Sequence, residues 1–245
     1  PLTPTQKNAL DEIFENLKSK RRMNRLLIGD VGSGKTIVAL ISALYAVKCG
    51  YQVAIVAPTE ILAEQHFNNA KRFFDGFDIN VAFLSGSVKG AERKERERDI
   101  ASGKTDVVIG THSVFSKTVK FRNLSFVVID EQHKFGVAQK YDLQEKGAGV
   151  DTLTLTATPI PRSVLMLLYD ELQLSEIDKS HKTKVKTFLV PDYKKDGMFS
   201  YVRDEAKKGN QAFIVCPKIC DSEGVETYGA KTCLLYTSPS PRDRT

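Results

Sequence analysis

The sequence lacks an apolar run long enough to cross a lipid bilayer. Its longest apolar stretch, residues 37–47, falls short of the roughly 20 residues that a membrane-spanning helix needs, and it indicates a buried helix instead. The first residues, Pro1 to Pro4, carry neither the basic nor the apolar region of a secretory signal peptide, and they include no initiating Met. We therefore predict a cytoplasmic protein without membrane contact, whose natural N-terminus lies further upstream.

Cysteine is also scarce, and its spacing does not favour a metal centre. The four cysteines stand at positions 49, 216, 220 and 233. Cys216 and Cys220 could form half of a zinc site, but such a site needs four ligands, commonly in two closely spaced pairs. No second pair and no nearby histidine accompany them. The sequence favours reduced thiols over a structural zinc site.

A strong excess of one charge is missing as well. Lysine and arginine total 36 against 30 for aspartate and glutamate, which gives a net charge of +6. This balance permits a polyanionic partner such as nucleic acid but does not require one. The densest run of charge, residues 91–100, mixes both signs. Such mixing indicates a solvated helix face with ion pairs between neighbours, and direct DNA contact is the less favoured alternative.

Helices and strands are expected to alternate along most of the chain. Thr3 can cap a first helix, and Gln6 completes a capping box with it. A strand at residues 25–28 leads into a glycine-rich turn and an apolar helix at residues 35–49. Further apolar runs recur at residues 53–57, 81–84, 107–109, 126–129 and 152–156. Apolar strands separated by helices predict an α/β, doubly wound parallel sheet, with its site outside the carboxyl ends of the strands.

The composition changes in the last third of the chain. Residues 175–186 are polar and basic, which predicts a linker, and a helix at 196–208 with a strand at 212–216 would begin a new unit. The final residues are rich in Pro, Ser and Arg and resemble translated linker sequence. We predict one domain over residues 1–182, a linker and the truncated start of a second lobe over 183–233, and a non-native tail over 234–245.

One motif predicts a phosphate-binding loop. The P-loop pattern is complete in Gly29, Asp30, Val31, Gly32, Ser33, Gly34, Lys35 and Thr36. Its glycines let backbone N–H groups turn toward phosphate oxygens, and the next helix directs its positive end toward the same anion. Lys35 can reach the β- and γ-phosphates, and the Thr36 hydroxyl can ligate Mg²⁺. A flexible glycine turn is the alternative, but the position between a strand and a helix argues against it.

Two acids end the apolar run at residues 126–129. Adjacent carboxylates at the end of a buried strand are costly unless they bind a cation or a water molecule. Asp130 is therefore a candidate Mg²⁺ ligand, directly or through water, and Glu131 is a candidate base for the attacking water. An acidic turn is the alternative, and the P-loop upstream favours the catalytic interpretation.

The four residues 130–133, called here the acidic box, and the residues that follow them resemble a known family. Residues 130–137, which begin Asp-Glu-Gln-His, resemble the superfamily 2 helicases and are most similar to the RecG family of bacterial ATP-dependent DNA helicases. Blocks at residues 2–6, 57–66, 110–113 and 156–162 follow in the family's order. The resemblance covers about residues 2–220 and implies a P-loop NTPase of RecA-like fold, with the incomplete start of a second RecA-like lobe. Transcription-repair coupling translocases share much of this lobe and are the nearest alternative.

The resemblance also implies roles for individual residues. Gln6 would read the adenine ring, although the capping box explains this residue equally well. The catalytic set would be Lys35, Asp130, Glu131, Gln132 and His133, the last two sensing the γ-phosphate, with a plain polar role as the alternative for His133. The DNA backbone would be contacted by Thr59, Glu60, Thr111 and His112. Turn and helix-cap chemistry explains Thr59 nearly as well. ATP state would be coupled to DNA contact by Thr156, Thr158 and Arg162.

The implied function is an ATP-dependent DNA helicase or translocase motor that remodels branched or forked DNA in recombination and repair. RecG-like proteins also carry a wedge domain and a complete second lobe, whose arginines finish the ATP site. Because neither is in this sequence, we expect the chain alone to bind Mg²⁺–ATP weakly and to turn over little or none. A P-loop ATPase that acts on protein partners is a further alternative, against which Gln6 and the Thr-Ala-Thr block at residues 156–158 argue.

Overall fold

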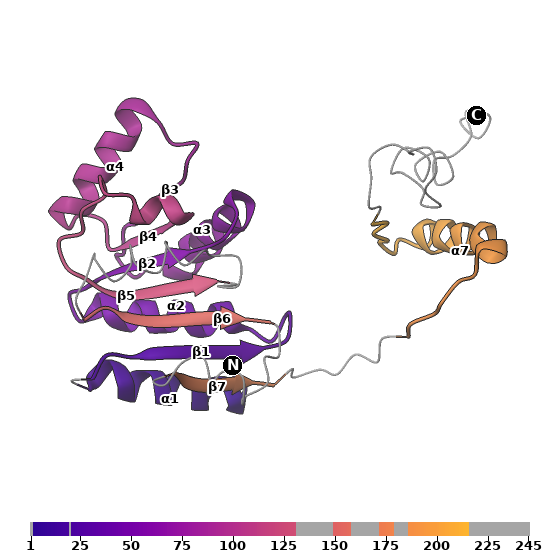
Figure 1. Ribbon diagram of the computed structural model, residues 1–245, viewed down its shortest axis with the longest axis horizontal. Coiled ribbons are helices and arrows are strands. Elements are labelled where there is room, and N and C mark those ends of the chain that lie inside the picture. The colour runs from indigo at the N-terminus through magenta and orange to yellow at the C-terminus, as the bar shows by residue number, and fades with distance from the viewer. Residues whose placement is uncertain (1, 20, 131–148, 158–171, 179–185, 216–245) are drawn as a thin grey trace. The chain divides into compact units, whose positions relative to one another are not determined.

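The computed structural model describes residues 2–19, 21–130, 149–157, 172–178 and 186–215 (Figure 1). The chain divides into two compact units, Pro1–Lys182 and Thr183–Thr245. Several predictions fall outside the described residues, namely those for Glu131, Gln132, His133, Thr158, Arg162, the cysteines at 216, 220 and 233, and the tail at 234–245. The assignment of the two units to two motor lobes stays a prediction.

The first unit is built on a parallel sheet. Its strands are β1 Asn24–Gly29, β2 Gln52–Val56, β3 Val81–Leu84, β4 Val107–Gly110, β5 Leu124–Asp130, β6 Asp151–Thr156 and β7 Gln173–Ile177. They lie in the order β3-β4-β2-β5-β6-β1-β7, and every described pairing is parallel. The predicted α/β fold with a doubly wound parallel sheet is thereby confirmed.

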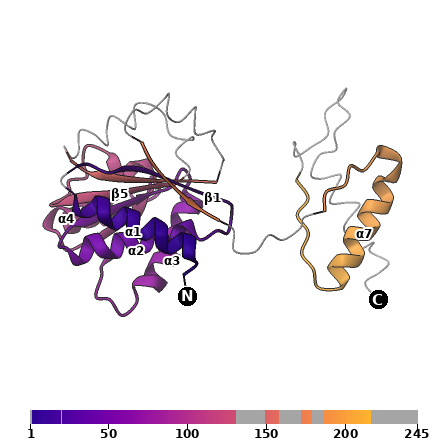
Figure 2. The ribbon, with the colours of Figure 1, turned by 90° about the horizontal axis from the view of Figure 1, so that it is seen from below.

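The sheet is buried on both faces, which explains why its strands are apolar throughout. The helices of this unit are α1 Pro4–Lys18, α2 Lys35–Lys48, α3 Glu60–Phe74 and α4 Gly90–Ser102, with a short 3₁₀ helix, η1, at His112–Phe115. Figure 2 shows α1, α2 and α3 on one side of the sheet. Val53 and Ile55 of β2 belong to the core on that side, whereas Ala54 and Val56 belong to a second core with residues of η1. Alternate residues of one strand therefore fill different cores.

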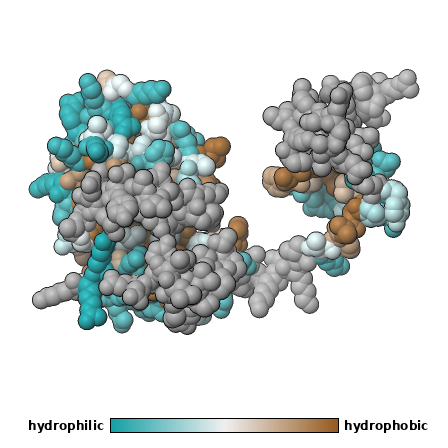
Figure 3. Space-filling view, viewed as in Figure 1, coloured by the Kyte–Doolittle hydropathy of each residue, from teal (hydrophilic) through white to brown (hydrophobic). Residues whose placement is uncertain are grey.

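Local sequence signals explain where the helices begin. The Thr3 side chain accepts a hydrogen bond from the backbone N–H of Gln6, and the Gln6 side chain accepts one from the N–H of Thr3, so the predicted capping box is present. Arg93 pairs with Glu97, and Arg96 with Glu92, along α4. Figure 3 shows mostly hydrophilic side chains over this helix. The solvated, ion-paired helix predicted at residues 91–100 is confirmed.

Two predictions about local structure are wrong. Residues 175–177, expected to open a linker, belong to β7, which pairs with β1. Arg25 explains why this polar strand joins the sheet, because its guanidinium donates to the Ser175 hydroxyl at 2.6 Å. The strand predicted at 212–216 is absent over residues 212–215, which are exposed and lack regular structure. A strand needs a neighbour for its backbone groups, and none is found in the described part of the second unit.

The second unit contains one described α-helix, α7, at Lys195–Lys207, preceded by the 3₁₀ helix η3 at Asp192–Lys194. The bounds of α7 agree with the helix predicted at 196–208. None of its residues is buried. Among the described residues of the whole chain, no helix is both long and apolar enough to span a membrane.

The edge of the sheet at β3 depends on a close backbone approach. Gly110, the last residue of β4, pairs with Leu84 of β3. A Cβ atom added at position 110 would overlap the backbone carbonyl of Leu84 and press on the Val114 side chain. Glycine is therefore the residue that lets the two strands end side by side.

Candidate nucleotide site

The P-loop connects strand β1, which lies between β6 and β7, to helix α2, as predicted. Gly29 ends β1, and Lys35 begins α2. Gly34 caps this helix with φ of +87°, in the left-handed region that side chains disfavour. A Cβ atom at position 34 would also overlap the side-chain amide of Gln6. The loop therefore needs glycine here for its turn and for its contact with α1.

Lys35 and Ser33 give the loop its polar interior. The Lys35 ammonium donates to the backbone carbonyls of Gly29 at 2.6 Å and Asp30 at 2.9 Å, across the curve of the loop. The Ser33 hydroxyl is buried and has no hydrogen-bond partner within the described residues. An unpartnered buried hydroxyl, a lysine and the N-terminus of a helix together fit a ligand that brings its own acceptors, such as a phosphate group.

Gln6 is a further part of this loop's support. Its side chain is only 8% exposed, and its amide nitrogen donates to the backbone carbonyl of Ser33 at 2.9 Å. A primary amide has two N–H groups and two acceptor positions, so the amide keeps one of each after its bonds to Ser33 and Thr3. Gln6 thus ties α1 to the P-loop, a contact that the sequence did not predict, while adenine recognition by Gln6 remains a prediction.

Asp130 lies at the same edge of the sheet as the P-loop. It pairs in register with Leu155 of β6, which in turn pairs with Leu27 of β1. Two inter-strand spacings separate β5 from β1, about 10 Å. Because the three strands are parallel, their carboxyl ends share one edge. The Asp130 carboxylate accepts a hydrogen bond at 2.8 Å from His66 of α3, and both side chains are largely buried.

His66 was not predicted as a site residue, although the sequence contains a signal for its position. Ala63 and Ala70 of α3 are fully buried, and His66 stands three and four residues from them. Residues at this spacing share one helix face, so His66 belongs to the face that packs on the sheet. Helix periodicity could therefore have predicted that His66 lies on the buried face of α3. It could not have predicted the contact with Asp130.

The predicted DNA-contacting residues follow two adjacent strands, β2 and β4, at this same edge. Thr59 caps α3 by accepting a hydrogen bond from the N–H of Leu62, so its alternative role as a helix cap is realised. Glu60 accepts hydrogen bonds from the hydroxyls of Ser87 and Ser85, which hold the pKa of its carboxyl below the usual value. DNA contact by Thr59 and Glu60 remains a prediction.

The structure also describes the predicted residues Thr36, Thr111, His112 and Thr156, of which Thr36 lies in the first turn of α2. Thr111 is 7% exposed and shares a hydrogen bond with Ser113, and His112 begins η1. Thr156 is buried at the end of β6, in register with Ile28 of β1. It therefore lies between the P-loop strand and the Asp130 strand, and its coupling role remains a prediction.

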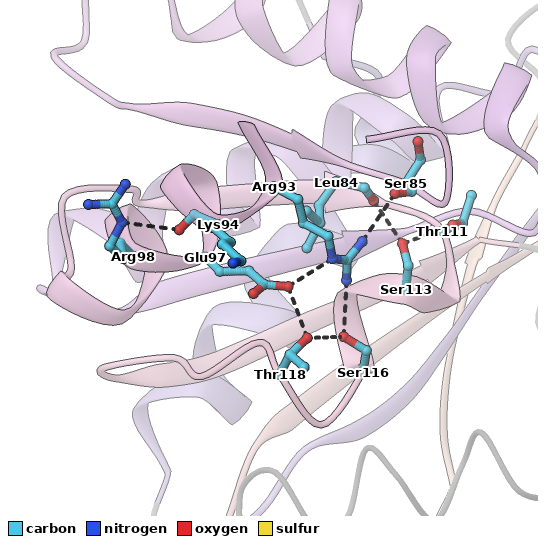
Figure 4. A network of polar contacts seen from close by, with 10 residues as sticks. All are labelled: Leu84, Ser85, Arg93, Lys94, Glu97, Arg98, Thr111, Ser113, Ser116 and Thr118. Atoms are coloured by element: carbon cyan, nitrogen blue, oxygen red, sulfur yellow. Dashed lines mark hydrogen bonds and ion pairs between the residues drawn. The ribbon is translucent and has the colours of Figure 1, made fainter. Parts of the chain in front are cut away.

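A polar network joins the loops beside these residues, as Figure 4 shows. Arg93 of α4 donates to the Ser85 carbonyl, to Glu97 and to the Ser116 hydroxyl. Ser113, in turn, donates to the Leu84 carbonyl at 3.2 Å. The loops after β3 and β4 are thus cross-linked by side chains.

A P-loop between a parallel strand and a helix, with an acid ending a nearby strand of the same sheet, defines a P-loop NTPase of RecA-like fold. The family model of the DEAD/DEAH box helicases matches residues 3–167, and the chain belongs to this family. Among the similar proteins are two curated ATP-dependent DNA helicases RecG. The one from Borreliella burgdorferi is 43% identical over 92% of this chain and 33% of its own length. The one from Bacillus subtilis is 44% identical over 94% of this chain and 34% of its own length.

A solved structure of RecG bound to a three-way DNA junction is similar in fold and in sequence. Its TM-score is 0.76 and its identity 41%, over 87% of this chain and 29% of that chain. These matches confirm the resemblance to RecG. The chain spans about a third of the length of the curated relatives that it matches.

Proposed function

We propose that this chain is the ATP-binding motor lobe of a DNA helicase that remodels branched DNA, since its relatives are named ATP-dependent DNA helicases and one solved relative is bound to a three-way DNA junction. The observation that carries the proposal is the shared sheet edge, at which the P-loop follows β1 and Asp130 ends β5. Only strand β6 lies between β1 and β5, so these two strands are about 10 Å apart. The relatives are named ATP-dependent DNA helicases, and we therefore propose ATP as the nucleotide and DNA as the partner. We also propose that the activity takes place in the cytoplasm, since bacterial DNA lies there.

The proposed chemistry follows from the donor set of the site. When bound, Mg²⁺–ATP supplies the phosphoanhydride bond whose hydrolysis drives the motor. Lys35 would balance negative charge on the β- and γ-phosphates, and the Thr36 hydroxyl and Asp130 would hold Mg²⁺. Glu131 would take the proton of the attacking water, and Gln132 and His133 would sense the γ-phosphate. Mg²⁺ fits this set because it prefers hard oxygen ligands.

The proposed DNA contacts lie along the ends of β2 and β4. Thr59, Thr111 and His112 would bind phosphodiester oxygens, which gives affinity without sequence preference. Glu60 carries a negative charge that would repel phosphate, so we assign it an indirect role, in which it orients the hydroxyls of Ser85 and Ser87. Thr156 would couple the nucleotide to these contacts, with Thr158 and Arg162 beyond it.

Nucleotide binding tests the proposal directly. Lys35→Ala should reduce the affinity for Mg²⁺–ATP below detection in isothermal titration calorimetry, because the variant loses the cation that faces the phosphates. Lys48→Ala is the matched control, since Lys48 is an exposed lysine in the last turn of the same helix. Equal affinities of wild type and Lys35→Ala would refute the site.

The DNA partner needs a separate measurement. In the protein expressed from the complete reading frame that encodes this chain, ATP hydrolysis should rise when a three-way DNA junction is added, and Lys35→Ala should abolish that rise. If the rate of ATP hydrolysis does not change with DNA but rises when a protein partner is added, a P-loop ATPase that acts on proteins is favoured instead.

A further inference from the structure

Asp130, the proposed Mg²⁺ ligand, is held by a histidine from another element. The Nε2 atom of His66 lies 2.8 Å from Oδ2 of Asp130. The side chains of His66 and Asp130 are only 11% and 15% exposed. Among the described residues His66 is the only hydrogen-bond partner of this carboxylate. Shielding from water makes such a bond stronger and more directional than a surface pair.

The chemistry of the two groups determines the direction of this hydrogen bond. An ionised carboxylate only accepts hydrogen bonds, so Nε2 of His66 donates and the imidazole carries its proton there. The bond engages Oδ2 of Asp130 and leaves Oδ1 for another partner. Carboxylates that bind metals are commonly oriented by such outer hydrogen bonds, whose loss costs roughly 10- to 100-fold in metal affinity.

Helix α3 makes His66 a rigid donor. The helix begins at Glu60 behind the Thr59 cap, and His66 lies about two turns further on, on the buried face with Ala63 and Ala70. Its side chain is therefore held by packing against the sheet rather than by a mobile loop. The same helix that starts at the proposed DNA contacts also reaches the proposed metal ligand.

We propose that His66 is a positioning residue that holds the Asp130 carboxylate in one orientation, so that Oδ1 remains available to Mg²⁺ or to a water bound to it. This inference rests on the proposed function, because it assumes that Asp130 serves bound Mg²⁺–ATP. It adds a residue outside the P-loop and the acidic box to the nucleotide site. It also connects the DNA-contacting helix to that site through a single hydrogen bond.

The test separates the metal from the nucleotide. Calorimetry measures the affinity of wild type and His66→Ala for Mg²⁺–ATP, and for ATP in the presence of EDTA. We expect His66→Ala to weaken Mg²⁺–ATP binding by about tenfold or more and to leave metal-free ATP binding unchanged. Asn68→Ala, an exposed position on the same helix, is the control and should match wild type in both measurements.

A pair of amide variants makes the test specific for the hydrogen bond. The amide nitrogen of a Gln side chain occupies nearly the place of Nε2 of His. The Asn side chain is one methylene shorter, so its amide nitrogen does not reach Asp130. His66→Gln should restore most of the Mg²⁺–ATP affinity, and His66→Asn should behave like His66→Ala. Thermal melting of each variant shows whether it is folded, and the comparison of Gln with Asn stands even if Ala unfolds the domain.

The outcomes distinguish this inference from the proposed function. If wild type binds Mg²⁺–ATP and His66→Ala binds it equally well, the positioning role is refuted while the nucleotide site stands. Equal losses of Mg²⁺–ATP and metal-free ATP affinity, or equal rescue by Gln and Asn, would also refute it. If wild type binds neither form of ATP, the proposed function itself fails.

Discussion

Gln52, at the amino edge of the sheet, uses its whole hydrogen-bonding capacity, whereas several polar side chains at the carboxyl edge keep unused capacity. Gln52, at the start of β2, donates to the carbonyls of Ile100 and Thr105 and accepts from the N–H groups of Arg122 and Asn123. Its one amide thereby joins the segments that precede β4 and β5. Gln52 therefore stabilises its part of this edge, although the buried Oε1 of Gln173, at the start of β7, has no hydrogen-bond partner in the described structure.

The carboxyl edge is organised differently. Ser33 has a buried hydroxyl without a partner in the described structure, and Asp130 has a single one. Gln6 keeps a donor and an acceptor position after its bonds to Ser33 and Thr3. Unused polar capacity lowers the stability of a protein alone, but it is what a polar ligand needs. At these residues of the carboxyl edge we expect a bound polar ligand to satisfy groups that reduce stability in its absence.

The largest change in stability is expected on substitution of Gln52, at the amino edge. Gln52→Leu keeps the size of the side chain but leaves four backbone groups without its hydrogen bonds, so we expect the free energy of unfolding to fall by about 3–5 kcal/mol. Urea denaturation followed by circular dichroism measures this change. Asn69→Leu, at an exposed amide of α3, should change stability by less than about 0.5 kcal/mol. A loss of under about 1 kcal/mol in Gln52→Leu would mean that water replaces the amide.

At the carboxyl edge we expect a substitution to leave the free energy of unfolding unchanged or to raise it. Ser33→Ala removes a buried hydroxyl that has no partner in the described structure, so without nucleotide we expect unchanged stability or a gain of up to about 1 kcal/mol. Ser42→Ala is the matched comparison, because its buried hydroxyl donates to the Val38 carbonyl at 2.9 Å. That variant should lose about 1 kcal/mol. If Ser33→Ala loses more than Ser42→Ala, the contrast between the edges is wrong.

The smallest expected effect concerns Asp151, at the start of β6. Burial raises the pKa of its carboxyl, against the opposing influence of the Met23 N–H and of Arg22. A raised pKa means that the folded state favours the protonated acid. This contribution to stability is complete below the unfolded pKa and is lost as pH rises through the folded one. At neutral pH the charged carboxylate therefore costs stability.

Asp151→Asn should remove that cost and keep an acceptor for the Met23 N–H. We expect the variant to be more stable than wild type at pH 7 by less than about 1 kcal/mol. The gain should shrink as the pH falls through the raised folded pKa toward the ordinary aspartate value of about 3.9. Urea titrations at several pH values measure it, with the exposed Asp75→Asn as control. A gain that grows toward low pH would contradict the assignment.

Sequence patterns predicted the parts of this fold that depend on neighbouring residues. The capping box at Thr3 and Gln6, the P-loop between β1 and α2, and the charged helix α4 follow from short spacings, and the structure confirms them. The five apolar runs that became β2 to β6 were found because both faces of a covered parallel sheet demand apolar residues. Membership of a helicase family followed from the same motifs.

Contacts between distant segments could not be predicted in this way. Strand β7 was missed because Ser175 and Glu176 look polar, and its place in the sheet depends on Arg25, far away in the sequence. The sheet order that puts β6 between β1 and β5 is likewise a property of the whole fold. So is the bond between His66 and Asp130, since no local spacing links α3 to the end of β5.

Gly110 shows how a residue without reactive chemistry can be as constrained as a catalytic one. Any side chain there would collide with the Leu84 carbonyl and shift the neighbouring residues Ser85 and Thr111. When related sequences are compared, this position should admit almost no variation, although it offers no functional group. If positions were ranked by how little they vary, Gly110 would therefore stand among the reactive residues. The structure shows that its constraint is steric rather than chemical, because a Cβ atom has no room there.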